Sequence, residues 1–106
     1  MIYVRETIVT TKNENNTIKV SPLGEILSEY IPQGKEIDLM NVDVEGLDLE
    51  VLKSNNWDKY SPRVLIVEDH LFNPEKPLES EITQFLKSKG YTLKANCLIS
   101  LIFFKD

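Results

Sequence analysis

Two short apolar runs, each followed by acidic residues, lie on either side of a segment with helical periodicity. The runs are residues 37–44 and 63–68, and the segment between them, residues 46–55, repeats leucine and valine at helical spacing among charged residues. A strand, a helix and a second strand in this order predict a β-α-β unit with parallel strands. Acidic residues after such strands gather at the carboxyl edge of the sheet, where open α/β folds bind their ligands.

The other segments extend this unit into a small α/β fold with a mixed sheet. Helices are predicted at about 22–31 and 78–89, because Ser21-Pro22 is typical of a helix start and Gly90 of a helix end. Two final strands, 91–94 and 98–104, are expected to run antiparallel around Ala95-Asn96. Trp57 and Tyr60 are expected to cover the core between helices and sheet.

The first 20 residues are rich in β-formers and contain no helical pattern. Residues 1–11 and 17–20 flank the polar cluster KNENN, which predicts a β-hairpin or two loosely paired edge strands. With residues 21–106 as the α/β part, we expect a single domain. The run RVLIVE, residues 63–68, is almost continuously apolar, which is typical of a central parallel strand covered on both faces.

Charge and cysteine content narrow the classes of partner. The formal charge of −5 and the pI near 4.9 argue against nucleic acid or an anionic membrane as a partner. The single cysteine, Cys97, lies in the apolar sequence NCLISLIFF and is expected to be a buried structural thiol in a reducing compartment. No signal pattern or run of ~20 apolar residues is present. A cytoplasmic location is therefore expected.

The tetrad Asp43-Val44-Glu45-Gly46 is the first candidate for chemistry. Alternate residues of a strand share a face, so Asp43 and Glu45 should point the same way, and Gly46 permits a sharp turn. Such a carboxylate pair could accept a proton from a hydroxyl, bind a divalent cation or hold an amine. The alternative is a helix start, at which Glu45 and Asp48 favour the helix dipole and cap free N–H groups.

Glu68, Asp69 and His70 form a second polar cluster at the end of the next strand. Adjacent parallel strands lie ~4.8 Å apart, so Glu68 is expected to line the same crevice as Asp43. His70 is the only histidine and a candidate general base, although an exposed loop histidine is the plainer alternative. No HxxxH or cysteine pair is present, so no metal site is predicted. A metal-dependent hydrolase using the acidic cluster stays a distant alternative.

Glycine-rich motifs are missing from the sequence. Its four glycines are far apart, so neither G-x-G-x-x-G nor a Walker loop is possible, and there is no G-x-S-x-G elbow. The sequence therefore offers no ready site for the phosphate or carboxylate of a nucleotide-like cofactor.

The motifs around both strands resemble those of a known protein family. Three segments are similar to the core of the FkbM-type S-adenosylmethionine-dependent methyltransferases. They are the strand that leads into Asp-Val-Glu-Gly, the helical segment Asp48 to Lys53, and the strand that begins at Pro62 and ends in Val-Glu. The similarity extends over roughly residues 17–104. It implies a partial Rossmann-like methyltransferase sheet and S-adenosylmethionine as the cofactor of the parent family. Asn41 departs from the basic residue that the family often has before the Asp.

The resemblance implies site roles for Asp43 and Glu45, beside the transferring methyl group or its acceptor, and less directly for Glu68. The family's glycine-rich loop and downstream acidic residue have no match, so no cofactor-binding residue can be named. We expect the C-terminal half of an enzyme that methylates a hydroxyl, from a truncated gene, a split reading frame or an expressed fragment. By itself it should be inactive and bind no S-adenosylmethionine. A non-catalytic, partner-binding module is the alternative.

The resemblance also predicts assembly. In the complete fold, the strand at 37–44 would lie in the middle of the sheet beside a strand of the other half. Without that half, its edge would be exposed unless the N-terminal segment folds back onto it. We therefore expect a homo-oligomer, most simply a twofold dimer, or a complex with a separately encoded N-terminal half.

Overall fold

The predicted β-α-β unit is present in the computed structural model, which describes residues 2–5, 10–12, 18–20, 22–43 and 46–106. It consists of β4 (Leu39–Asp43), α3 (Asp48–Lys53) and β5 (Val64–Glu68). β4 and β5 are parallel, with Leu39 opposite Val64 and Val42 opposite Val67. Apolar alternation fixes this register, because Met40, Val42, Leu65 and Val67 then all face the buried side.

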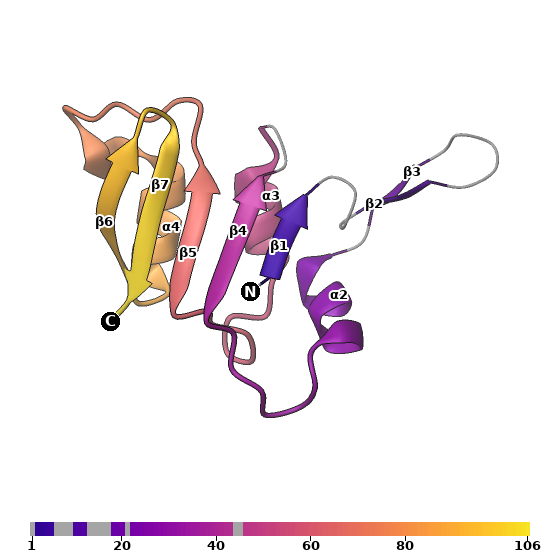
Figure 1. Ribbon diagram of the computed structural model, residues 1–106. Coiled ribbons are helices and arrows are strands. Elements are labelled where there is room, and N and C mark those ends of the chain that lie inside the picture. Colours follow the sequence, from indigo (N-terminus) through magenta and orange to yellow (C-terminus); the bar gives the residue numbers. More distant parts are fainter. Residues whose placement is uncertain (1, 6–9, 13–17, 21, 44–45) are drawn as a thin grey trace.

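The described strands form a five-stranded sheet in the order β1-β4-β5-β7-β6 and a separate hairpin (Figure 1). β7 (Ser100–Lys105) runs antiparallel between β5 and β6 (Tyr91–Cys97). The hairpin pairs β2 (Thr10–Lys12) with β3 (Ile18–Val20). The expected α/β class with a mixed sheet is confirmed.

The predicted hairpin is present in the pairing of β2 with β3, but the first strand of the chain lies elsewhere. β1 (Ile2–Arg5) does not pair with residues 17–20 but joins the main sheet parallel to β4, with Ile2 opposite Met40 and Arg5 opposite Asp43. The N-terminal segment thus folds back onto β4, the case in which we did not expect an exposed edge at residues 37–44, and β1 is the outermost described strand on that side. The reason is that β4 offers a full row of N–H and C=O groups, which a nearby β-forming segment can satisfy.

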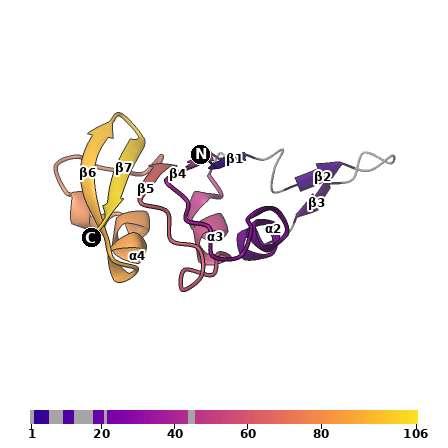
Figure 2. The ribbon, with the colours of Figure 1, turned by 60° about the horizontal axis from the view of Figure 1, so that its bottom comes forward.

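All three described α-helices lie on one side of the sheet (Figure 2). They are α2 (Leu23–Tyr30), α3 and α4 (Glu81–Ser88), the last preceded by the short 3-10 helix η1 (Pro77–Glu79). Leu65 and Val67 are fully buried beneath them, whereas Val64 and Ile66 on the opposite face are only half-buried. The prediction that β5 is covered on both faces is therefore wrong for the described residues.

The core fills the space between this sheet face and the helices. Trp57 donates from Nε1 to the carbonyl oxygen of Leu52 at 2.8 Å and makes edge contacts with the rings of Phe85 and Tyr91. Trp57 and Tyr60 are buried, as predicted for residues that cover the core. The other fully buried members are Leu23, Met40, Val42, Leu52, Leu65, Val67, Leu86, Leu101 and Phe103.

The helix ends follow local chemistry. Gly90 has φ 91° directly after the last turn of α4, as predicted, and Ser80 caps the first turn by accepting from the N–H of Thr83 at 3.1 Å. α2 begins one residue after Pro22, and the N–H of Leu23 is satisfied by the hydroxyl of Ser54 at 2.8 Å. Ser21 lies outside the described residues.

The last turn lies further along the chain than predicted. Ala95 and Asn96 are inside β6, which has a bulge between Leu93 and Ala95, and the turn is formed by Leu98 and Ile99. Leu98 adopts φ 55°, a conformation that leucine rarely takes, so a turn at this residue could not be predicted from the sequence. The predicted burial of Cys97 is also wrong, because the extended hairpin carries this side chain into solvent.

Tyr91 provides a test of the core. Its hydroxyl donates to the carbonyl oxygen of Pro62 at 2.6 Å, and burial raises the pKa of its phenol far above the ordinary value. The neutral form is preferred in the folded state, so its contribution to stability is complete below pH ~10, where the unfolded phenol begins to ionise, and is lost above it. We expect the unfolding free energy to fall above that pH by up to about 1.4 kcal/mol per pH unit more than in Tyr91→Phe.

Urea unfolding from pH 8 to 11 measures this difference. Tyr30→Phe is the matched control, because Tyr30 is 75% exposed and its substitution should leave the pH slope unchanged. Equal alkaline slopes for the wild-type chain and Tyr91→Phe would contradict the argument.

Candidate functional site

The carboxyl ends of β4 and β5 meet at one edge of the sheet. Asp43 is the last residue of β4 and Glu68 the last of β5, and each lies one position beyond the paired Val42 and Val67. Parallel pairing therefore brings these two carboxylates to neighbouring strand ends, as predicted. Glu45 and Val44 lie outside the described residues, so the predicted pairing of Asp43 with Glu45 is not tested.

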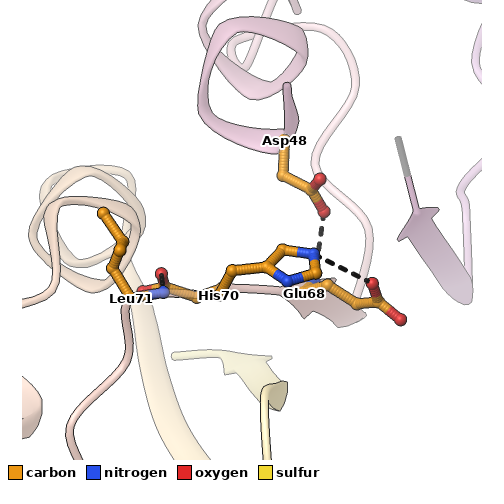
Figure 3. Close-up of polar contacts among 5 residues, drawn as sticks. Asp48, Glu68, His70 and Leu71 are labelled. Atoms are coloured by element: carbon orange, nitrogen blue, oxygen red, sulfur yellow. Dashed lines mark hydrogen bonds and ion pairs between the residues drawn. The ribbon is translucent and has the colours of Figure 1, made fainter. Parts of the chain in front are cut away.

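His70 lies two residues after β5 and contacts Glu68. Its Nε2 atom is 3.7 Å from Glu68 Oε2, and the two side chains are 52% and 27% exposed. This separation is longer than a hydrogen bond but allows an ion pair when the imidazole is protonated. Figure 3 shows the His70 ring directed toward the carboxylates of both Glu68 and Asp48.

Asp48 is a member of the site that the sequence did not identify as one. It is the first residue of α3 and only 2% exposed, and its Oδ2 atom accepts from the backbone N–H of Glu68 at 3.2 Å. Asp48 lies in the first turn of α3, which agrees with the helix-dipole part of the alternative, but the N-cap residue is Leu47, which makes no side-chain cap. The only available signal was an acidic residue two positions after Gly46.

Asp69 has a structural role between these residues. Its Oδ2 atom accepts from the hydroxyl of Ser80 at 2.6 Å, and its Oδ1 atom from the N–H of Leu71 at 3.0 Å. Its own N–H donates to the carbonyl oxygen of Ile99 at 2.8 Å. Asp69 thus joins the end of β5 to the start of α4 and to the β6–β7 turn, and so holds the backbone on which His70 is carried.

Two adjoining pockets open at this edge. Each has a volume of about 440 Å³, and they share Gly46, Glu68 and His70. Asp43 lines only the pocket that has the fewer lining residues, whereas Asp48 lines only the other pocket. Gly46 has φ 93°, which explains glycine at the turn between β4 and α3. The structure therefore brings Asp43, Glu68 and His70 together, and adds Asp48.

This arrangement is suited to proton transfer. The carboxylate of Glu68 lies beside the imidazole, while the exposed half of His70 is open to a ligand. Within the described ranges, no three His, Cys, Asp or Glu side chains lie close enough together to hold a metal ion. The metal-dependent hydrolase alternative thus gains no support from these residues.

The lining residues do not match the needs of an anionic or nucleotide-like ligand. Among the described residues around the two pockets there is no lysine or arginine, and Gly46 is the only glycine.

None of the helices in the described part of the chain is long and apolar enough to cross a membrane.

Comparison with known proteins places the chain in a family. Residues 5–93 match the methyltransferase FkbM domain. The chain is also 34% identical over 85 residues to methyltransferase sdnD of Sordaria araneosa. This match covers 72% of the chain but 31% of the relative, so the chain spans about a third of the length of the protein it matches. No solved structure matches. The resemblance seen in the sequence is confirmed: the chain belongs to the FkbM methyltransferase family.

Proposed function

We propose that this chain forms the acceptor side of an enzyme that transfers a methyl group from S-adenosylmethionine to a hydroxyl group. The observation that carries the proposal is the contact between His70 and Glu68 beside Asp43 at the carboxyl edge of the sheet. Family membership supports methyl transfer as the reaction. A proton acceptor at the pocket supports a hydroxyl as the accepting group, because its oxygen must lose a proton when it is methylated.

Each residue of the site then has a separate task. His70 Nε2 takes the proton that the acceptor hydroxyl loses, and Glu68 stabilises the imidazolium that results. Asp43, and Glu45 by the resemblance, orient the acceptor. Asp48 fixes the end of β5 through the N–H of Glu68. Most of the rate gain would come from holding the acceptor in line with the donor, so these positions must be accurate.

S-adenosylmethionine, when bound, supplies a methyl group on a positively charged sulfur, but the residues of this chain do not fit it. Its carboxylate and adenosine groups need backbone N–H donors of the kind that a glycine-rich strand–helix turn provides. The sequence contains no such glycine-rich motif, and the described pocket walls lack lysine and arginine. We therefore propose that donor binding depends on a glycine-rich segment that is not among these residues.

The open face of the sheet supports the same proposal. Val64, Ile66 and Ile102 are apolar and half-buried on the face opposite the helices, and parallel strands are nearly always covered on both faces. We propose that this face and the outer edge of β1 are covered in the working protein, by a donor-binding half or by a second copy of the chain.

Isothermal titration tests the missing donor site. We expect the 106-residue chain to give no measurable binding of S-adenosylmethionine, because the N–H donors for its carboxylate are lacking. One-to-one binding at micromolar affinity would contradict this expectation.

Substitutions at the pocket test the assigned roles. In a complex of this chain with a donor-binding half, His70→Gln should lower kcat about 10²- to 10⁴-fold, the usual contribution of a general base. Asp43→Asn and Glu45→Gln should abolish methyl transfer without lowering the unfolding free energy, because both carboxylates are expected at the pocket and not in the core.

Activity assays and urea unfolding of the same variants provide the measurements. Glu75→Gln is the matched control, since Glu75 is exposed and does not line either pocket. Loss of cooperative unfolding in Asp43→Asn or Glu45→Gln would show that the carboxylates are structural.

Sedimentation equilibrium tests whether a second copy of the chain covers the open face of the sheet. At micromolar concentration the chain alone should form a dimer or larger oligomer, and Ile66→Ser should shift it toward the 12.2 kDa monomer. Leu98→Ser is the control, because Leu98 is exposed in the β6–β7 turn. A wild-type chain that is monomeric throughout would contradict assembly through its own copies.

A further inference from the structure

Three exposed leucines lie on the segments of the chain that line the pocket containing Asp48. This leucine rim consists of Leu47, Leu71 and Leu78, which are 54%, 93% and 61% exposed. Leu71 lines the pocket, while Leu47 and Leu78 are next in sequence to its lining residues. Figure 3 shows Leu71 and Asp48 on opposite sides of the His70 ring.

The rim comes from two connections of the chain, the one before α3 and the one between β5 and α4. Leu47 precedes α3, Leu71 follows β5, and Leu78 lies in η1. Three exposed leucines on segments that line one pocket are unusual, because each costs free energy in water. The pocket also contains apolar walls from Leu49 and Ile82. Together these side chains offer contact to an apolar molecule that reaches into the opening.

The charges inside the pocket all have one sign apart from His70. Its charged lining residues are Asp48, Glu50, Glu68, Asp69, Glu79 and Glu81, and no lysine or arginine is found among the described lining residues. A cleft lined by one sign of charge concentrates ligands of opposite charge and repels those of the same charge. An anionic ligand would meet these carboxylates without a lysine or arginine partner among the described lining residues, so its binding would be weakened by like-charge repulsion.

We infer that the methyl acceptor is an alcohol with an apolar skeleton and with either no charge or a positive charge. The inference rests on the proposed function and names the acceptor class of that same site. The apolar skeleton lies against the leucine rim, and the hydroxyl reaches the edge of the pocket beside His70. Acceptors that carry a phosphate or carboxylate are rejected by the acidic lining.

Three probes of equal length separate charge from apolar contact: 8-amino-1-octanol, 1,8-octanediol and 8-hydroxyoctanoate. Their dissociation constants can be measured by NMR titration of the full 106-residue chain, without any donor. We expect the amine and the diol to bind, and the carboxylate to bind at least tenfold more weakly. No binding of any probe at millimolar concentration would overturn the inference, as would equal affinity for the carboxylate and the diol.

Variants assign the two parts of the recognition. Leu71→Ser and Leu78→Ser should weaken binding of the amine and the diol about tenfold, a loss of about 1.4 kcal/mol, without changing their ratio. Glu79→Gln with Glu81→Gln should weaken the amine relative to the diol. Leu98→Ser is the matched control, because this leucine is 86% exposed but does not line the pocket, and its substitution should change no affinity.

The leucine rim could instead contact a protein, and sedimentation of the same variants decides this. If Leu71→Ser leaves probe binding unchanged but abolishes self-association, the acceptor inference is overturned. Failure of the proposed function is distinguishable from this result. If the probes bind in the predicted order but the complete enzyme transfers no methyl group, the proposed function alone is overturned. If the complete enzyme methylates carboxylated or phosphorylated alcohols in preference to neutral ones, the inference about the acceptor alone is overturned.

Discussion

The parallel pairing of β4 with β5 is the constraint on which the rest of the structure depends. In this register Met40 and Val42 share the helix-covered face with Leu65 and Val67, and all four are fully buried. A slip of one residue would turn each apolar side chain to the other face. The same register sets Asp43 and Glu68 at neighbouring strand ends. Core packing therefore places the site, and no interaction within the site is required to bring its carboxylates together.

Much of the fold could be predicted because its elements follow local patterns. The β-α-β unit came from apolar periodicity, and the end of α4 from a glycine that takes a positive φ. The pairing of β1 with β4 is different, since it joins residues about 38 positions apart and depends on which strand edge is open. The turn at Leu98 also escaped prediction, because β6 contains a bulge and continues through Ala95 and Asn96, where the turn was expected.

The site shows the same division between local and distant information. Asp43, Glu68 and His70 could be named because each stands at or just after an apolar run. Asp48 could not, because an acid at the start of a helix usually favours the helix dipole, and its contact with the Glu68 backbone spans 20 residues. The leucine rim was missed for a similar reason. Its members come from two connections, and only the folded chain brings their segments to one pocket.

The exposure of the His70–Glu68 pair links the site to the open face of the sheet. With the imidazole about half exposed and 3.7 Å from the carboxylate, water screens their attraction, and exposed ion pairs contribute only ~0–1 kcal/mol. Covering the edge would remove that water and strengthen the stabilisation that Glu68 gives to the imidazolium. On the proposed function, the donor-binding half therefore does more than hold the donor. By excluding solvent it would also strengthen the attraction between Glu68 and the protonated ring that a proton transfer produces.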